Sequence, residues 1–249
     1  EIGAETMHFN HWRVRSLEHN SAIAAAMCWD ANRSVDEAKT DYFRRLFGPD
    51  AVPLAFDAYK VLDEVTHFSK NNNYNIGFTG DWVYKNSTGS PGYYWSRLMK
   101  SIRLYDEAAR LFGELANAAQ NPGGKQQARY MADICLMSKL HIRAVYHLQN
   151  AKLPLMGYNA WPTDNEHACW PPPEKLTDLL AEARQAYEYE RAYAQMYAKW
   201  VESCDEQGQL VMHEKGVIEP FGGFAEALYE RMKTELENRE NVERTGQTP

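Results

Sequence analysis

Apolar side chains recur every three or four residues over most of this 249-residue chain, which is the spacing of one face of an α-helix. This periodicity predicts helices over about 17–29, 34–47, 50–69, 91–120, 122–150, 174–203 and 223–237. No internal repeat of fixed period accompanies them. Such helices bury their apolar faces against one another, so we predict a mainly α protein with an antiparallel helical bundle.

Local signals mark where several of these helices begin and end. Ser34-Val-Asp-Glu37 is a capping box, in which the Ser side chain and the Glu side chain each bond the other residue's backbone amide. The helix that it opens is expected to stop at Gly48-Pro49, and Asn121-Pro122 provides an N-cap and a first helical residue. The segment 17–29 is small and apolar nearly all round, which predicts a buried helix.

The only segment with an extended pattern is residues 5–12, where Met7 and Phe9 fall on one face. A single strand cannot satisfy its backbone hydrogen bonds alone. We therefore expect its neighbouring strands to come from elsewhere.

Composition narrows the classes of function. The chain has 27 Lys and Arg against 34 Asp and Glu, a net charge of −7, which argues against a nucleic-acid-binding protein. No uncharged run approaches the roughly 18–20 residues of a membrane helix. The four cysteines are far apart without a Cys-x-x-Cys pair, which disfavours a zinc site and a dense disulfide framework, although one or two bridges remain possible. No metal or other cofactor is predicted.

The expected strand ends in a cluster of polar and aromatic residues: Asn10, His11, Trp12 and Arg13. Flat polar groups bond sugar hydroxyls and an indole packs on the apolar face of a pyranose, so we predict sugar binding here. The alternative is that Trp12 belongs to the core and that Arg13 and Arg15 are a solvated pair. A metal site on His8 and His11 is disfavoured, because residues three apart in a strand point to opposite faces.

A second candidate is the Gly-, Asn- and Ser-rich stretch 71–92, which lacks helical periodicity and is rich in aromatics. A loop of about 20 residues within a compact domain is usually functional or disordered. Its aromatics, Asn residues and Asp81 resemble the rim of a ligand site, and we predict that Tyr74 and Trp82 contact the sugar. The alternative is a loop that its own aromatics pack onto the bundle.

Catalytic groups are harder to find. A glycosidase needs two carboxylates on either side of one bond, yet most Asp and Glu residues lie on solvated helix faces. Glu5 and Asp81 have site-like neighbours but no evident partner, and His141 falls in an apolar register, where a core histidine is expected. No motif for phosphate binding, serine hydrolysis or zinc proteolysis is present. No catalytic residue is assigned.

Four segments form a recognisable series: Asn10-His11-Trp12-Arg13, the helix end Cys28-Trp29-Asp30, the capping box Ser34-Val-Asp-Glu37, and Tyr42-Phe43-Arg-Arg-Leu-Phe47-Gly48-Pro49-Asp50-Ala51. The series resembles the last strand and helix of a (β/α)8-barrel glycoside hydrolase and the helical domain that follows, as in alpha-glucuronidase-like and hexosaminidase-like enzymes. The stretches 200–210 and 216–220 also resemble the final helices of such domains.

The resemblance implies that residues 1–30 are the last β/α unit of a catalytic TIM barrel and that 31–249 are a C-terminal helical domain. Barrel strands end at the active site, so Asn10 to Arg13 would line the sugar subsite. The catalytic carboxylates of such enzymes usually lie on earlier strands, which this sequence does not contain.

Three functions follow as hypotheses. In the first, the chain is the C-terminal portion of a glycoside hydrolase acting on oligosaccharides or glycoconjugates, inactive until the N-terminal portion, a separate chain or removed segment, completes the site. In the second, it is a stand-alone helical module that binds carbohydrate or a protein partner without catalysis. In the third, it is a different all-helical enzyme with a metal or cofactor.

Overall fold

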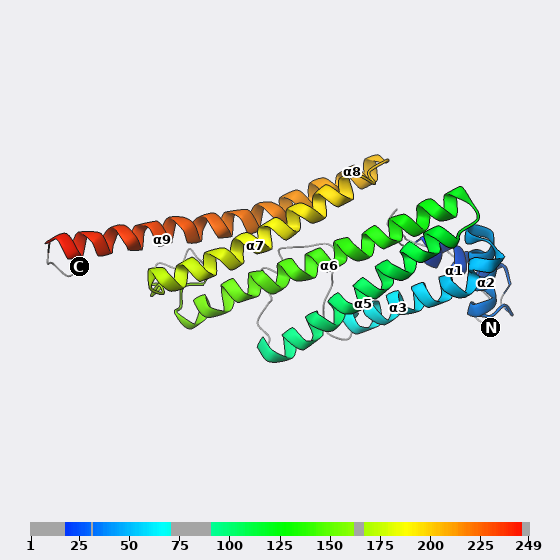
Figure 1. Ribbon diagram of the computed structural model, residues 1–249, viewed down its shortest axis with the longest axis horizontal. Helices are drawn as coiled ribbons and strands as arrows, with labels where there is room; N and C mark the ends of the chain where they lie inside the picture. Colours follow the sequence, from blue (N-terminus) through cyan, green and yellow to red (C-terminus); the bar gives the residue numbers. More distant parts are fainter. Residues whose placement is uncertain (1–17, 31, 71–90, 162–166, 246–249) are drawn as a thin grey trace. The chain divides into compact units, whose positions relative to one another are not determined.

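A computed structural model of the protein describes residues 18–30, 32–70, 91–161 and 167–245. Over these residues the chain is helical and contains no strand (Figure 1). The elements are α1 (Glu18–Trp29), α2 (Val35–Phe47), the short 3-10 helix η2 (Pro49–Ala51), α3 (Val52–Lys70), α5 (Pro91–Ala118), α6 (Pro122–Gly157), α7 (Pro173–Ala198), α8 (Cys204–His213), the π-helix η3 (Glu214–Ile218) and α9 (Glu219–Thr245). The mainly α class is confirmed, while the expected strand over residues 5–12 lies outside the described residues.

The chain divides into two compact units. Unit 1 comprises residues 1–74, 103–136 and 200–207, and unit 2 comprises residues 75–102, 137–199 and 208–249. The predicted boundary after residue 30 separates the last unit of a barrel from a helical domain. The other parts of that barrel are not in this chain, so the boundary stays a prediction.

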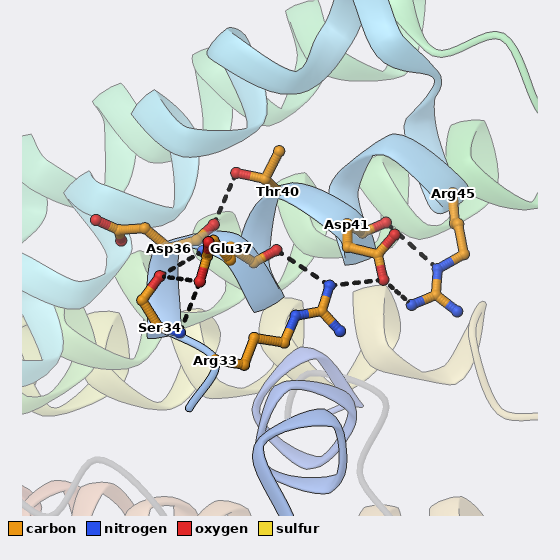
Figure 2. Close-up of polar contacts among 7 residues, drawn as sticks. All are labelled: Arg33, Ser34, Asp36, Glu37, Thr40, Asp41 and Arg45. Carbon is orange, nitrogen blue, oxygen red and sulfur yellow. Dashed lines mark hydrogen bonds and ion pairs between the residues drawn. The ribbon is translucent and has the colours of Figure 1, made fainter. Parts of the chain in front are cut away.

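The capping box forms as predicted at the start of α2. The Ser34 Oγ accepts a hydrogen bond from the Glu37 amide at 3.2 Å, and the Glu37 carboxylate accepts one from the Ser34 amide at 2.9 Å (Figure 2). The helix ends at Phe47, and Gly48 follows with φ of 98°, in the region that favours glycine. Both ends of α2 therefore agree with the sequence signals.

Aromatic rings from three helices form the core of unit 1. Phe43 of α2 stacks on Tyr59 of α3 with ring centroids 4.9 Å apart, and the edge of Phe56 meets the Phe43 ring at 5.2 Å. Tyr59 in turn packs edge-to-face against Phe112 of α5 at 5.0 Å. Phe43 and Phe112 have no exposed surface, so these contacts fix α2, α3 and α5 together.

Residues of the turn between α5 and α6 donate hydrogen bonds to carbonyls at the C-terminus of α2. The Gln120 amide donates to the Phe47 carbonyl at 2.8 Å, and the Asn121 side chain donates to the carbonyl of Arg45 at 3.0 Å. Pro122 is the first residue of α6, as expected, but the Asn121 side chain bonds carbonyls at the end of α2. These contacts satisfy carbonyls that the end of a helix leaves without partners.

Unit 2 is built on α7 and α9, which run side by side (Figure 1), and on the C-terminal half of α6. Its core is lined by buried aliphatic and aromatic side chains, among them Leu148, Leu155, Leu176, Phe221 and Leu228. Residues spaced three or four apart along 122–150 predict one apolar face that includes Ile134, Met137, His141, Val145 and Leu148. The last four of these are buried, whereas Ile134 is half-buried.

The sequence prediction missed α8 and η3. It extended the previous helix to about residue 203, whereas α7 ends at Ala198, and it began the last helix at 223 instead of Glu219. The cause is the glycine at 208 and that at 216, which disfavour a helix by about 1 kcal/mol each. A second capping box offsets part of this cost: the Ser203 Oγ accepts a hydrogen bond from the Glu206 amide, and the Glu206 carboxylate accepts one from the Ser203 amide.

Candidate functional site

The residues predicted to bind sugar are Asn10, His11, Trp12, Arg13, Tyr74 and Trp82. All six lie outside the described residues. Their roles stay predictions, and the site is built here from the residues that the structure does describe.

Helix α1 leaves much of its apolar surface uncovered. The sequence predicts burial all round, yet the buried residues of α1 are His19 and Ile23, whereas Cys28 and Trp29 at its end are exposed. Trp29 retains 92% of its accessible surface. Trp29 is thus a large apolar side chain that the described part of the chain leaves exposed at the end of an apolar helix.

A groove of about 550 Å³ lies beside this Trp, between α1 and α2. Small and apolar residues make up most of its lining: Ala22, Ala25, Ala26, Trp29, Ala38, Tyr42 and Leu46. Asp30, Arg33 and Arg45 supply its charged groups. The groove therefore has an aromatic ring and charges of both signs. Its alanines have short side chains, so a bound group could approach the helix backbones closely.

The two arginines that line the groove both pair with Asp41 on α2. Arg33 lies 2.9 Å from the Asp41 carboxylate, Arg45 pairs with the same carboxylate, and Arg33 also bonds the Glu37 carbonyl at 3.4 Å (Figure 2). The hydrogen bond from Arg33, assisted by that from Arg45, holds the pKa of Asp41 below its usual value. Because both cations favour the ionised form of Asp41, this carboxyl is a poor proton donor at neutral pH.

Unit 2 contains a second notable cluster, centred on Glu190 of α7. The Glu190 side chain has no exposed surface, and its Oε1 lies 2.6 Å from Nδ1 of His141 on α6. Its Oε2 lies 2.9 Å from Nε2 of His213 at the end of α8, out of line for a hydrogen bond. Tyr193 stacks on the His213 ring with centroids 4.3 Å apart. His141 is thus a core histidine with a polar partner, as predicted.

Burial and charge oppose each other in this cluster. Burial favours the neutral forms, but the Glu190 carboxylate and its hydrogen bond raise the pKa of His141 above its usual value. Likewise, burial would raise the pKa of Glu190, yet the charge and hydrogen bond of His141, together with the charge of the nearby His213, hold it below the usual value. The pair is therefore ionised at mildly acidic pH despite its burial.

Two further polar groups lie on α6. His147 lies 2.8 Å from the Glu182 carboxylate, which also accepts a hydrogen bond from Asn150 at 3.0 Å. Lys152 is buried, with its ammonium 4.5 Å from the centroid of the Trp161 ring. Burial lowers the pKa of Lys152 to about 7.

The described residues contain no group of three His, Cys, Asp or Glu side chains arranged to hold a metal ion. All four cysteines are free thiols, so neither of the bridges left open by the sequence forms in this structure. No helix in the part of the chain that the structure describes is long and apolar enough to span a membrane.

Comparison of the chain with protein-family models, with curated proteins and with solved structures finds no match. The resemblance to glycoside hydrolases therefore rests on the sequence motifs alone.

Proposed function

We propose that this chain is the C-terminal portion of a glycoside hydrolase that acts on oligosaccharides or glycoconjugates. In this proposal α1 is the last helix of a (β/α)8 barrel, and a companion segment or chain supplies the other strands. The helical domain is fixed to that barrel and contributes residues to its sugar site.

The observation that carries the proposal is the uncovered surface of α1. A barrel helix packs against the sheet on its inner side and against a neighbouring helix on each flank, so a wide apolar surface is expected on it. The sequence of α1 has this character, but α2 covers only part of it, and Trp29 remains exposed beside an alanine-lined groove. Tryptophan and arginine beside a small-residue pocket are typical of interface hot spots. In this proposal the companion segment or chain binds in the groove.

The chain's own contribution to the reaction is substrate binding. Asn10, His11, Trp12 and Arg13 would meet the sugar at the end of the last strand, and Tyr74 and Trp82 would approach it from the 71–92 loop. Proton transfer is assigned to carboxylates of the companion. This division is compatible with the groove, whose two arginines, Arg33 and Arg45, are both paired with the Asp41 carboxylate.

The test is reconstitution with purified chains. The 1–249 chain alone should not hydrolyse aryl glycosides, and addition of the N-terminal portion should restore turnover. Trp29→Ala should weaken this association at least tenfold without unfolding the chain, since Trp hot spots contribute about 2 kcal/mol or more. Leu236→Ala, at an exposed apolar position on α9, is the matched control and should associate normally.

Turnover by the chain alone, or association unaffected by Trp29→Ala, would contradict the proposal. The second candidate, a stand-alone carbohydrate-binding module, is favoured by the same aromatic and charged groove. It requires a monodisperse chain whose Trp fluorescence responds to sugars without any companion. Trp29→Ala would then remove the fluorescence response.

A further inference from the structure

The shape of the groove between α1 and α2 is complementary to itself. The Trp29 side chain is 92% exposed at the edge of the groove, and Ala22, Ala25 and Ala26 line the hollow beside it. Counted from Ala22, the other three residues lie three, four and seven positions further along α1, so all four fall on one face of the helix. This face therefore has both a large projecting ring and a hollow with short side chains.

The charges of the groove are also complementary to one another. Asp30 directly follows Trp29, lines the groove and is exposed. The Arg45 side chain is 69% exposed and shares the Asp41 carboxylate with Arg33, so these two cations keep one unit of positive charge between them (Figure 2). The groove thus offers an accessible anion and an accessible cation.

A surface that has both halves of a contact suits a second copy of the same chain. In a dimer with a two-fold axis, a contact between two different residues is always made twice, once in each direction. Each Trp29 ring can then enter the alanine hollow of the other copy, and each Asp30 meets Arg45 of the other copy. Arg45 is the more accessible arginine, since the Arg33 side chain is only 26% exposed.

We propose that the free chain forms a two-fold dimer through this groove, and that the companion of the proposed function displaces the second copy when it binds. The dimer depends only on residues of this chain, whereas the displacement rests on the proposed function.

Net charge favours this face for contact between two copies. Each copy has a net charge of −7, so two copies repel one another on average. The groove lining has two arginines and one aspartate, so two copies meet there without an excess of negative charge. Its lining is smaller than the roughly 20–30 residues a side of a standard interface, so the dimer should be weak and should depend on concentration.

Sedimentation equilibrium of the full chain over a roughly hundredfold range of concentration tests the dimer. The wild-type chain should pass from monomer to dimer as its concentration rises. Trp29→Ala should raise the dissociation constant at least about tenfold without loss of helical circular dichroism. Leu236→Ala, at an exposed apolar position on α9, is the control and should dimerise like the wild type. A wild-type chain that is monomeric throughout, or a dimer that Trp29→Ala leaves unchanged, would overturn the proposal.

Two charge reversals test which groups meet across the two-fold axis. Asp30→Lys alone brings two cations together at each contact, and Arg45→Glu alone brings two anions together, so each variant should dimerise more weakly than the wild type. An equimolar mixture of the two variants should recover association, because opposite charges then face each other at both contacts of the mixed dimer.

The control for the charge reversals is Arg110→Glu on α5. Arg110 is exposed and pairs with Glu114 four residues on, much as Arg45 pairs with a carboxylate on its own helix, and the change in net charge is the same. This variant should dimerise like the wild type. If the mixture of Asp30→Lys and Arg45→Glu associates no better than either variant alone, the proposed pairing is overturned.

Addition of the N-terminal portion to the wild-type dimer tests the displacement. A complex of one chain with one N-terminal portion should replace the dimer. If turnover is restored while the chain remains dimeric, the displacement is overturned. If the dimer forms but the N-terminal portion restores no turnover, the proposed function fails and the dimer stands.

Discussion

His141 and Glu190 are 49 residues apart in sequence, and their Nδ1 and Oε1 atoms lie 2.6 Å apart in the interior of unit 2. The neighbours of both residues along their helices are apolar. Met137 and Val145 lie four residues either side of His141, Ala186 lies four residues before Glu190, and all three are buried. The pair is thus an ionic contact within an otherwise apolar layer, and its contribution depends on both partners being present.

Removal of the carboxylate should destabilise the protein strongly. Glu190→Ala leaves the buried imidazole of His141 without its anion, and breaking a buried pair in this way costs about 3–5 kcal/mol. Urea denaturation at pH 6 measures the change. Glu182→Ala removes the more exposed partner of His147 and should cost no more than about 1 kcal/mol. Equal losses in the two variants would show that burial of Glu190 adds nothing to its effect.

Lys152 should make stability rise with pH on the alkaline side of neutrality. Its pKa is lowered to about 7 in the folded state against 10.5 for an ordinary lysine, so between these values the unfolded chain binds more protons. Lys152→Met removes this group and should be the more stable protein near pH 6, with the difference shrinking by pH 9. Denaturation of both proteins at each pH measures it. A constant difference would contradict the lowered pKa.

The hydrogen bonds of the capping box at the start of α2 should stabilise the folded protein. Ser34→Ala removes the acceptor of the Glu37 amide and should lower the free energy of unfolding by about 1 kcal/mol. The neighbouring Val35→Ala, at an exposed position in the same turn, should change it by less than about 0.5 kcal/mol. Thermal unfolding of both variants measures these changes. If Ser34→Ala leaves the free energy of unfolding unchanged, the capping hydrogen bonds do not stabilise the protein.

Sequence reasoning succeeded where the determining contacts are local. The helix start at Ser34 and its end at Gly48 depend on residues within four positions, and the apolar register of α6 depends on spacing alone. The second capping box, Ser203 with Glu206, has the same spacing as the first and could have been found by the same rule. It was overlooked because the nearby glycine at 208 indicated a break.

The candidate sites could not be predicted because they depend on distant parts of the chain. Glu190 reads as one more charge on a helix face, and only the packing of α6 and α8 reveals its two imidazole neighbours. In the same way the apolar sequence of α1 predicts burial, and only the structure shows that α2 leaves Trp29 uncovered. Periodicity gives the faces of a helix but does not say which face has a partner.

The start of α6 lies close to the end of α2 at Gly124. A Cβ added there would lie 2.1 Å from the Leu46 carbonyl oxygen, a backbone atom that cannot move aside like a side chain. Gly124→Ala gains helix propensity of about 1 kcal/mol. It must also separate the two helices and disturb the contact of Gln120 with the Phe47 carbonyl, and overpacking of this kind costs about 1–3 kcal/mol.

The clash should prevail over propensity, so Gly124→Ala is expected to lower the free energy of unfolding in urea denaturation. Gly123 provides the matched control, because it lies in the same helical turn, is exposed, and has no atom within 4 Å of an added Cβ. Gly123→Ala should therefore stabilise the protein by up to about 1 kcal/mol. If both substitutions stabilise the chain equally, the close packing of α6 on the end of α2 does not exist in solution.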